Sequence, residues 1–431
     1  MALRHNQGTV TAYEAFAGKN APMNDVPVYR YRDLSAVARA STILQRATQN
    51  VTVEIADAAK LADVRGAWSE LLTRADVPNI FMDPSLIAAT DAADPSTPHR
   101  ALLAWKYIDG RRQLSGVWSF AIERPRKSAL PTRILCTPAF RHGHLATPVI
   151  DRHCLEETLD AMLDAIAGDT SLPKILAIDG MSADSATCDA LMRLLQERGS
   201  APLVFESFAR PKLMSDLDGK AYLEKALSSS TRKKLRQHRR RLAEKGALTS
   251  VIVTAPAAVR DALEEFLAME AAGWKGQNGT ALLSDPADAA FMRGAVAALA
   301  DHGAASIHAL YFGGKPVSMQ IVARAGSTAF TWKTAYDESF HDFSPGMLLF
   351  EDYTAAFLAD KTIACVDSCS LDDTGYMAAW TERQTVADMW IDARRGGSLE
   401  FSVLGKLQKT YRDLRASAKD LYLNWQKHQK K

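Results

Sequence analysis

The sequence predicts an α/β fold made of two similar units, each a mixed, mostly antiparallel sheet flanked by helices. The chain has 431 residues, which is more than one ordinary domain core accommodates. Its content of 47% hydrophobic and 24% charged residues is typical of globular proteins. Strand and helix patterns alternate along the chain, and the same order of elements occurs twice.

The first unit begins with a strand at 51–55 and a helix through Trp68. Two β-rich runs, 101–108 and 114–122, flank Asp109-Gly110, which is a strong hairpin signal. Further helix and strand patterns follow in alternation, at 154–167, 174–178, 186–198 and 203–208.

The second unit repeats this order. Two amphipathic helices are expected between residues 256 and 303, and the strands 306–311 and 317–324 flank Gly313-Gly314, a second hairpin signal. Later elements are a third strand at 328–334, a helix from Pro345 onward and a strand that ends at Asp367. A loop that leads into a short helix at 371–380 and a last strand at 385–391 follow. The sequence therefore predicts two copies of one α/β unit.

The helix that begins near Pro345 has the features of an anion site. Ser344 is a plausible N-cap and Pro345 fits the first helical position. The first acid in this helix is Glu351, so its first turn carries no carboxylate. The backbone amides of Gly346, Met347 and Leu348 and the positive end of the helix dipole are therefore left for an outside anion. An ordinary capped helix start is the alternative reading.

The corresponding helix of the first unit carries acids near its start, namely Asp151, Glu156 and Glu157. Negative charge at a helix N-terminus repels phosphate. The second unit is therefore the one expected to hold a polyphosphate.

Positive charge is concentrated in one segment. Residues 228–245 hold eight Lys or Arg, among them Arg232 and Arg236, against the single acid Glu244, which gives +7 in a chain whose formal net charge is +2. Three readings are open: a solvated helix face, attraction of an anionic cofactor or acidic acceptor, and binding of a nucleic acid backbone. No helix-turn-helix, zinc-finger or RNP-like signature supports a general nucleic-acid binder.

Five scattered cysteines argue against a disulfide framework, and Cys365 and Cys369 lack further ligands for a tetrahedral metal site. No metal is expected. No apolar run is long enough to cross a bilayer and the N-terminus lacks the apolar core of a signal peptide, so a cytoplasmic location without membrane insertion is expected.

The expected organisation has five parts. Residues 1–48 form a poorly ordered arm, 49–215 the first unit, 216–250 a basic helical segment and 251–398 the second unit. Residues 399–431 form an amphipathic helix with one apolar stripe, which docks on the body or pairs with another chain as an oligomer contact. The stripe consists of Val403, Leu404, Leu407, Tyr411, Leu414, Leu421, Tyr422 and Trp425.

An ordered set of motifs resembles the GNAT-type acetyltransferases of the BioF2-like (CelD-like) group, relatives of the FemABX peptidyltransferases with two tandem GNAT-like halves. The motifs are Glu270 to Lys275, Gly313 to Val317, Ala335 to Glu338, Phe343 to Gly346, Asp367, and Tyr376 to Trp380. The resemblance is best over 215–395. It implies tandem GNAT-like domains, the second catalytic, and acyl transfer from acetyl-CoA or another acyl-CoA, with the pyrophosphate on Ser344-Pro345-Gly346. One departure is Tyr376-Met377, where the group usually has Tyr-Lys.

Transfer of an acyl group from a thioester to an amine requires alignment, a proton acceptor and polarisation of the carbonyl. Candidate bases are Glu270, Asp337 and His341, and candidate proton donors to the leaving thiol are Tyr336 and Tyr376. Each has a structural alternative: Glu270 as a cap or salt bridge, Asp337 as an Asx turn, His341 as a solvated loop residue.

Residues expected to contact substrate are Trp274, Lys275, Lys333, Asp367, Arg232 and Arg236. For Trp274 the alternative is core packing, and for Lys333 it is pairing with an acid. The expected activity is N-acyl transfer, in the first instance of acetyl, from CoA to an amine of a small molecule, sugar or envelope precursor. An aminoacyl-tRNA-dependent Fem-like peptidyltransferase and a catalytically silent acyl-CoA-binding protein remain as alternatives.

Overall fold

The computed structural model describes residues 51–126 and 128–429, and the predicted N-terminal arm lies outside this range. The described strands form one mixed sheet in the order β1-β2-β3-β4-β6-β13-β7-β12-β11-β10-β9-β8, with β5 paired to β3. The predicted fold class, a mixed and mostly antiparallel sheet flanked by helices, is confirmed.

The first half contains seven strands: β1 (Val51–Asp57), β2 (His99–Ile108), β3 (Arg111–Glu123), β4 (Ile134–Thr137), β5 (Val149–Ile150), β6 (Ile175–Ser182) and β7 (Leu203–Leu213). Its helices are α1 (Ala58–Leu61), α2 (Arg65–Arg74), α3 (Pro84–Ala93), α4 (Leu155–Gly168) and α5 (Ala186–Glu197). The sequence analysis predicted no helix at α3, which begins at Pro84 with Asp83 as its N-cap.

The second half contains α6 (Gly219–Ala226), α7 (Ser229–Ala243), β8 (Leu248–Val253), α8 (Pro256–Ala272), α9 (Trp274–Gln277) and α10 (Pro286–Asp301). The strands β9 (Ala305–Phe312), β10 (Lys315–Ala325) and β11 (Thr328–Tyr336) follow. The chain ends with α11 (Pro345–Ala359), β12 (Cys365–Asp367), the 3-10 turn η5 (Tyr376–Ala379), β13 (Glu382–Asp392) and α12 (Leu399–Gln429).

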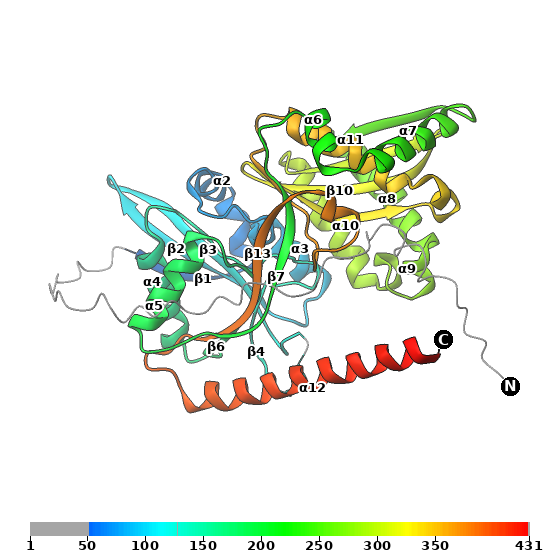
Figure 1. Ribbon diagram of the computed structural model, residues 1–431. Coiled ribbons are helices and arrows are strands. Elements are labelled where there is room, and N and C mark those ends of the chain that lie inside the picture. The colour runs from blue at the N-terminus through cyan, green and yellow to red at the C-terminus, as the bar shows by residue number, and fades with distance from the viewer. Residues whose placement is uncertain (1–50, 127, 430–431) are drawn as a thin grey trace.

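The two halves exchange their last strands. β13 pairs with β6 of the first half, and β7 pairs with β12 of the second half. β7 and β13 also pair with each other from Leu203↔Trp390 to Lys212↔Glu382, and they run side by side through the middle of the molecule (Figure 1). The backbone hydrogen bonds of one continuous sheet therefore join the halves.

Both predicted hairpins are present. Asp109 and Gly110 have φ of 49° and 75°, and Gly313 and Gly314 have φ of 57° and 80°. Two consecutive positive φ values are the signature of a type I′ turn, whose twist matches the flanking strands.

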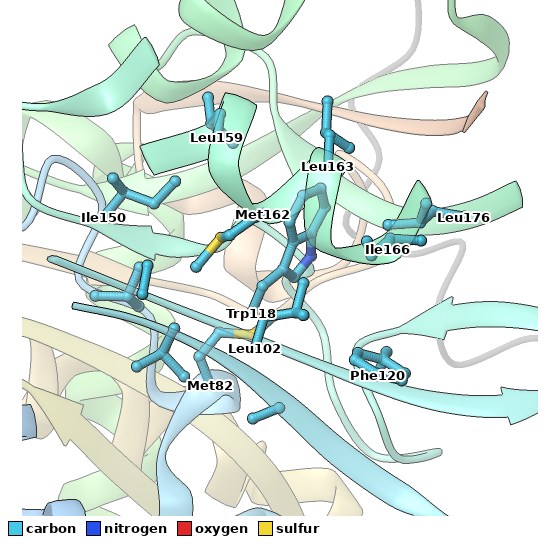
Figure 2. Packing of buried hydrophobic residues seen from close by; sticks show 14 of the residues in the cluster. Met82, Leu102, Trp118, Phe120, Ile150, Leu159, Met162, Leu163, Ile166 and Leu176 are labelled. Atoms are coloured by element: carbon cyan, nitrogen blue, oxygen red, sulfur yellow. The ribbon is translucent and has the colours of Figure 1, made fainter. Parts of the chain in front are cut away.

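Each half has its own core. In the first half, Trp118 of β3 is 1% exposed and packs under the α4 side chains Met162, Leu163 and Ile166 (Figure 2). In the second half, α8 and α10 cover one face of the sheet, while α6, α7 and α11 cover the other (Figure 1).

Aromatic side chains from both halves form a shared core. Phe81 of the first half makes edge contacts with Phe330 and Trp332 of β11, at ring-centroid distances of 5.4 Å and 6.0 Å. Phe140 lies 5.1 Å from Phe291 of α10. Burial of these rings fixes the first half against the α8 and α10 face of the second.

The C-terminal helix docks through only part of the expected stripe, because Leu404 packs against the buried cluster around Trp390. Phe401, Gly405 and Gln408 are buried, whereas Val403, Leu407 and Leu414 are 55%, 50% and 65% exposed. A Cβ at position 405 would lie 2.0 Å from the Leu203 side chain on β7, so the glycine sets the contact face through close approach.

Within residues 51–126 and 128–429, no helix has the length and apolar content needed to span a bilayer. In the same residues, no group of three or more His, Cys, Asp or Glu side chains is arranged to bind a metal ion. Cys136, Cys154, Cys188 and Cys369 are buried thiols and Cys365 is partly buried.

Candidate active site

The strands β11 and β12 diverge. They pair in parallel only at Thr328↔Cys365, Ala329↔Val366 and Phe330↔Asp367, after which β12 ends and β11 continues to Tyr336. On its other side, β11 carries a bulge against β10, because Lys333 pairs with Ile321 and Thr331 with Val322, leaving Trp332 as the extra residue. The bulge changes the direction of the side chains where the strands separate.

The start of α11 follows the free end of β11. Ser344 occupies the N-cap position with φ of 51°, and its side chain makes no capping bond. Pro345 is at the first helical position, as predicted, and the first turn holds no acid.

The number of free amides at this start is smaller than expected. The amides of Met347 and Leu348 both donate to the Ser344 carbonyl, at 3.0 Å and 3.1 Å. Within the described chain, Gly346 is left as the first-turn amide without an acceptor. A Cβ placed on Gly346 would meet no atom within 4 Å, so the space beside its α-carbon is open.

The basic helix α7 lies beside the start of α11. Arg239 of α7 donates to Asp352 at 2.8 Å and to the Leu348 carbonyl at 3.1 Å. Arg241 and Lys245 line an open hollow of about 570 Å³ together with Glu244, Asp342 and Phe343, which directly precedes Ser344. The hollow therefore holds charges of both signs, with Glu244 paired to Arg240 at 3.4 Å.

The two basic residues predicted to contact substrate lie elsewhere on α7. Arg232 lies 3.7 Å from Glu224 of α6 and donates to the Leu227 carbonyl at 3.3 Å. Arg236 is exposed. The structure brings Arg241 and Lys245, rather than Arg232 and Arg236, to the hollow at α11.

Glu270 forms a salt bridge, which was the structural alternative to its role as a catalytic base. Its side chain is 3% exposed, accepts from Lys275 Nζ at 2.7 Å and accepts from the Leu282 amide at 2.8 Å. Lys275 also donates to the Thr334 carbonyl on β11, at 3.1 Å. Glu270 and Lys275 thus tie the loop after α8 to β11, and both carboxylate oxygens of Glu270 are occupied.

Lys333 points to the first half. Its Nζ lies 3.2 Å from Nδ1 of His142, and Nε2 of His142 lies 2.8 Å from Oδ1 of Asp288 on α10. The alternative to substrate contact for Lys333 was pairing with an acid, whereas its hydrogen-bond partner is this histidine. Burial and the neighbouring Lys275 lower the pKa of Lys333 to about 8.

The other candidate bases are engaged in local turns. Asp337 Oδ1 accepts from the amide and hydroxyl of Ser339, at 2.9 Å and 2.6 Å, which is the predicted Asx alternative. His341 is exposed and contacts Asp342 at 3.1 Å.

The two candidate proton donors occupy different places. Tyr336 ends β11, where it pairs with Ser318. Tyr376 is partly buried and packs on Phe350 of α11 at a ring-centroid distance of 5.7 Å.

Trp274 and Asp367 also differ in environment. Trp274 is 44% exposed, so the alternative of core packing is wrong, and its amide donates to Glu338 at 2.6 Å. Asp367 is buried and accepts from the Cys369 amide and from Gln384, at 2.7 Å and 2.6 Å, with Arg210 3.4 Å away. Asp367 lines a cleft of about 270 Å³ between the halves, together with Asp76, Asp184 and Lys212.

Sequence reasoning missed His142 and Asp288. They lie 146 positions apart, and Lys333 is 191 positions from His142. No local pattern links residues at such separations, because the exchanged strands and the shared aromatic core bring them together.

Residues 229–376 match the family described as the GNAT acetyltransferase domain. No curated protein matches the sequence. Among solved structures, FemX is 12% identical with a TM-score of 0.55, over 79% of this chain and 98% of its own.

Two further solved structures are similar at lower TM-scores. The C-terminal DUF2156 domain of a putative lysylphosphatidylglycerol synthetase from Agrobacterium fabrum is 14% identical with a TM-score of 0.48, over 81% of this chain and 96% of its own. A tandem GNAT protein from the clavulanic acid biosynthesis pathway is 12% identical with a TM-score of 0.42, over 81% and 99%.

The FemX similarity supports a shared fold and, at this identity, nothing about substrate. The diverging strands, the bulge on β11 and the uncharged start of α11 all fall within the matched residues. Residues 229–376 therefore resemble a GNAT acetyltransferase domain, as the sequence motifs indicated, and the likeness of the chain to FemX is one of fold.

Proposed function

We propose that the protein transfers an acyl group, in the first instance acetyl, from an acyl-CoA to an amine acceptor. The CoA pyrophosphate would lie at the start of α11, and the acyl arm would enter between the diverging ends of β11 and β12. The second half would be the catalytic unit, and the first half would help to form the acceptor cleft.

The observation that carries this proposal is the Gly346 amide at the start of α11, which has no acceptor in the described chain and has open space beside its α-carbon. A phosphate needs a close approach to backbone donors at the positive end of a helix dipole, and a side chain at this position would obstruct it. The first turn adds no negative charge, and Arg241 and Lys245 lie in the adjoining hollow.

The test is a calorimetric titration of acetyl-CoA into the wild type and Gly346→Val. A Cβ at position 346 meets no protein atom, so the fold should tolerate valine while its methyl groups occupy the phosphate position. We expect the affinity to fall at least about tenfold, which corresponds to roughly 1.4 kcal/mol.

The chain offers a matched control in Gly66→Val. Gly66 is also the second residue of its helix, α2, and a Cβ there likewise meets no atom within 4 Å. Both variants should keep the wild-type melting temperature, and Gly66→Val should keep the wild-type affinity. Equal affinity in Gly346→Val and the wild type would refute the proposed pyrophosphate site.

A screen of amines with acetyl-CoA, followed by release of free thiol, then tests the transfer itself. Small amines, amino sugars and envelope precursors are the acceptor classes to include. Tight binding of acetyl-CoA without turnover of any amine would instead favour a catalytically silent acyl-CoA-binding protein.

The second candidate is an aminoacyl-tRNA-dependent peptidyltransferase. It is favoured by α7, whose exposed residues include Lys233, Arg236, Arg240 and Arg241, beside the same hollow. Thermal protection by aminoacyl-tRNA and none by acetyl-CoA would support this candidate against the first.

A further inference from the structure

Three side chains from three separate elements form a hydrogen-bonded chain at the junction of the halves. Asp288 lies in the first turn of α10, His142 in the segment after β4, and Lys333 on β11 beside the bulge. His142 is 9% exposed. The distances are 2.8 Å from Asp288 Oδ1 to His142 Nε2 and 3.2 Å from His142 Nδ1 to Lys333 Nζ.

The partners of His142 assign its tautomer. A carboxylate only accepts hydrogen bonds, so Nε2 carries the proton that it donates to Asp288, and Nδ1 is left as an acceptor for an N–H of Lys333. Burial and the positive charge of Lys333 lower the pKa of His142 to about 4, so the ring is neutral at pH 7. Because Nδ1 accepts in this tautomer, a deprotonated Lys333 amine uses one of its N–H bonds for the contact with His142. The lone pair of the amine is not used in that hydrogen bond.

The ring itself is held from several sides. Trp332 donates its indole N–H to the His142 carbonyl at 2.8 Å, and Phe291 of α10 stacks on the imidazole at a centroid distance of 5.6 Å. Arg141, next to His142, lies 3.1 Å from the second carboxylate oxygen of Asp288. His142 can therefore fix the position of the Lys333 amine.

The charges around Lys333 favour loss of its proton near neutral pH. Burial lowers its pKa most, followed by the ammonium of Lys275, which is anchored to the neighbouring Thr334 carbonyl. Glu270, Asp288 and Cys369 act in the opposite direction. The titratable groups that face Lys333 come from several elements. They are Glu270 of α8, Lys275 of α9, Asp288 of α10, His142 and His144 of the first half, and Cys369 after β12.

We propose that Lys333 is the proton acceptor of the acyl transfer, and that His142 and Asp288 are its positioning residues. This inference rests on the proposed function. The neutral acceptor amine attacks the thioester carbonyl carbon and forms the C–N bond, and its excess proton passes to Nζ of Lys333. The C–S bond then breaks, and the resulting ammonium of Lys333 returns the proton to the CoA thiolate.

The site supplies a reason for using a lysine in this role. A base is most effective when its pKa is near the working pH, and an ordinary lysine, at about 10.4, is protonated. The carboxylate oxygens of Glu270 and Oδ1 of Asp337 are occupied by internal donors. Lys333 has instead one N–H fixed by His142 and its lone pair available.

The protonation of Lys333 can be measured without any acceptor. Trace labelling of the full chain with acetic anhydride between about pH 6 and 10, with acetyl-Lys333 quantified by mass spectrometry, gives its titration midpoint. We expect a midpoint near 8 in the wild type. Lys275→Gln should raise it, because a like charge is removed and Glu270 is left unpaired, whereas Asp288→Asn should lower it.

This pair of opposite shifts separates a local electrostatic role from a structural one, because partial unfolding would move every midpoint toward the ordinary lysine value. Asp301→Asn, at the exposed end of α10, is the matched control and should leave the midpoint unchanged. A wild-type midpoint near 10.4, or no response to Asp288→Asn, would overturn the inference.

Turnover of the amine found in the screen decides the catalytic role. Lys333→Met and Asp288→Asn should each lose at least about tenfold in turnover, and the wild-type rate should rise with pH through the labelling midpoint. Full activity of Lys333→Met overturns the inference while the proposed function stands. A midpoint near 8 with no amine turned over by the wild type overturns the proposed function, and the role of Lys333 with it.

Discussion

Glu270 is predicted to stabilise the fold rather than to act as the catalytic base. Glu270→Gln keeps the size of the side chain but removes its charge. Two charge-assisted bonds are weakened, one to Lys275 at 2.7 Å and one to the Leu282 amide at 2.8 Å. Such bonds contribute roughly 1.5–3 kcal/mol each when buried, and the Glu270 side chain is 3% exposed.

The expected loss in the free energy of unfolding is about 2–4 kcal/mol. It is smaller than the sum of two full bonds because the amide oxygen of glutamine still accepts one hydrogen bond, and because Lys275, at 25% exposure, regains contact with water. Urea denaturation followed by tryptophan fluorescence measures the loss.

The same helix provides the control. Glu264 of α8 pairs with Arg293 at 2.6 Å, but the two side chains are 54% and 47% exposed. An exposed pair of this kind contributes about 1 kcal/mol or less, so Glu264→Gln should be close to neutral. Equal losses in the two variants would refute the reasoning, and a stable Glu270→Gln protein without acyl transfer would return Glu270 to the list of bases.

Two further predictions concern the second half. His308 on β9 is 5% exposed, and burial lowers its pKa to about 4, so the folded chain binds this proton more weakly than the unfolded chain does. The free energy of unfolding should therefore be highest above about pH 6.5 and should fall by roughly 3 kcal/mol toward pH 4. His308→Gln should flatten this part of a stability–pH profile. If the profile is unchanged, His308 is not the group responsible. Leu235→Ala, at the buried face of α7, should lower the free energy of unfolding by about 2–4 kcal/mol, as measured by urea denaturation. Lys233→Ala on the exposed face of the same helix should leave it nearly unchanged. Similar losses in the two variants would mean that α7 is not held by the face that contains Leu235.

Local chemistry made several parts of the fold predictable. Asp109-Gly110 and Gly313-Gly314 adopt the positive φ values that their hairpins need. The start of α11 at Pro345, without an acid in its first turn, is visible in the sequence, because proline position and local charge are local properties. The short strand β8 and the helix α3 were missed, since β8 is mostly exposed and the loop signals before Pro84 concealed the helix.

The sequence by itself determined that two α/β units follow one another and that the second one carries a helix start at Pro345 without an acid in its first turn. The tertiary structure decided which side chains meet. The exchange of β7 and β13, and the packing of Phe81 on Phe330 and Trp332, bring His142 to Lys333. Periodicity and turn chemistry act over a few residues, whereas the partners of Glu270, Lys333 and Asp367 depend on how whole elements pack, and that is set by burial and strand pairing over the entire chain.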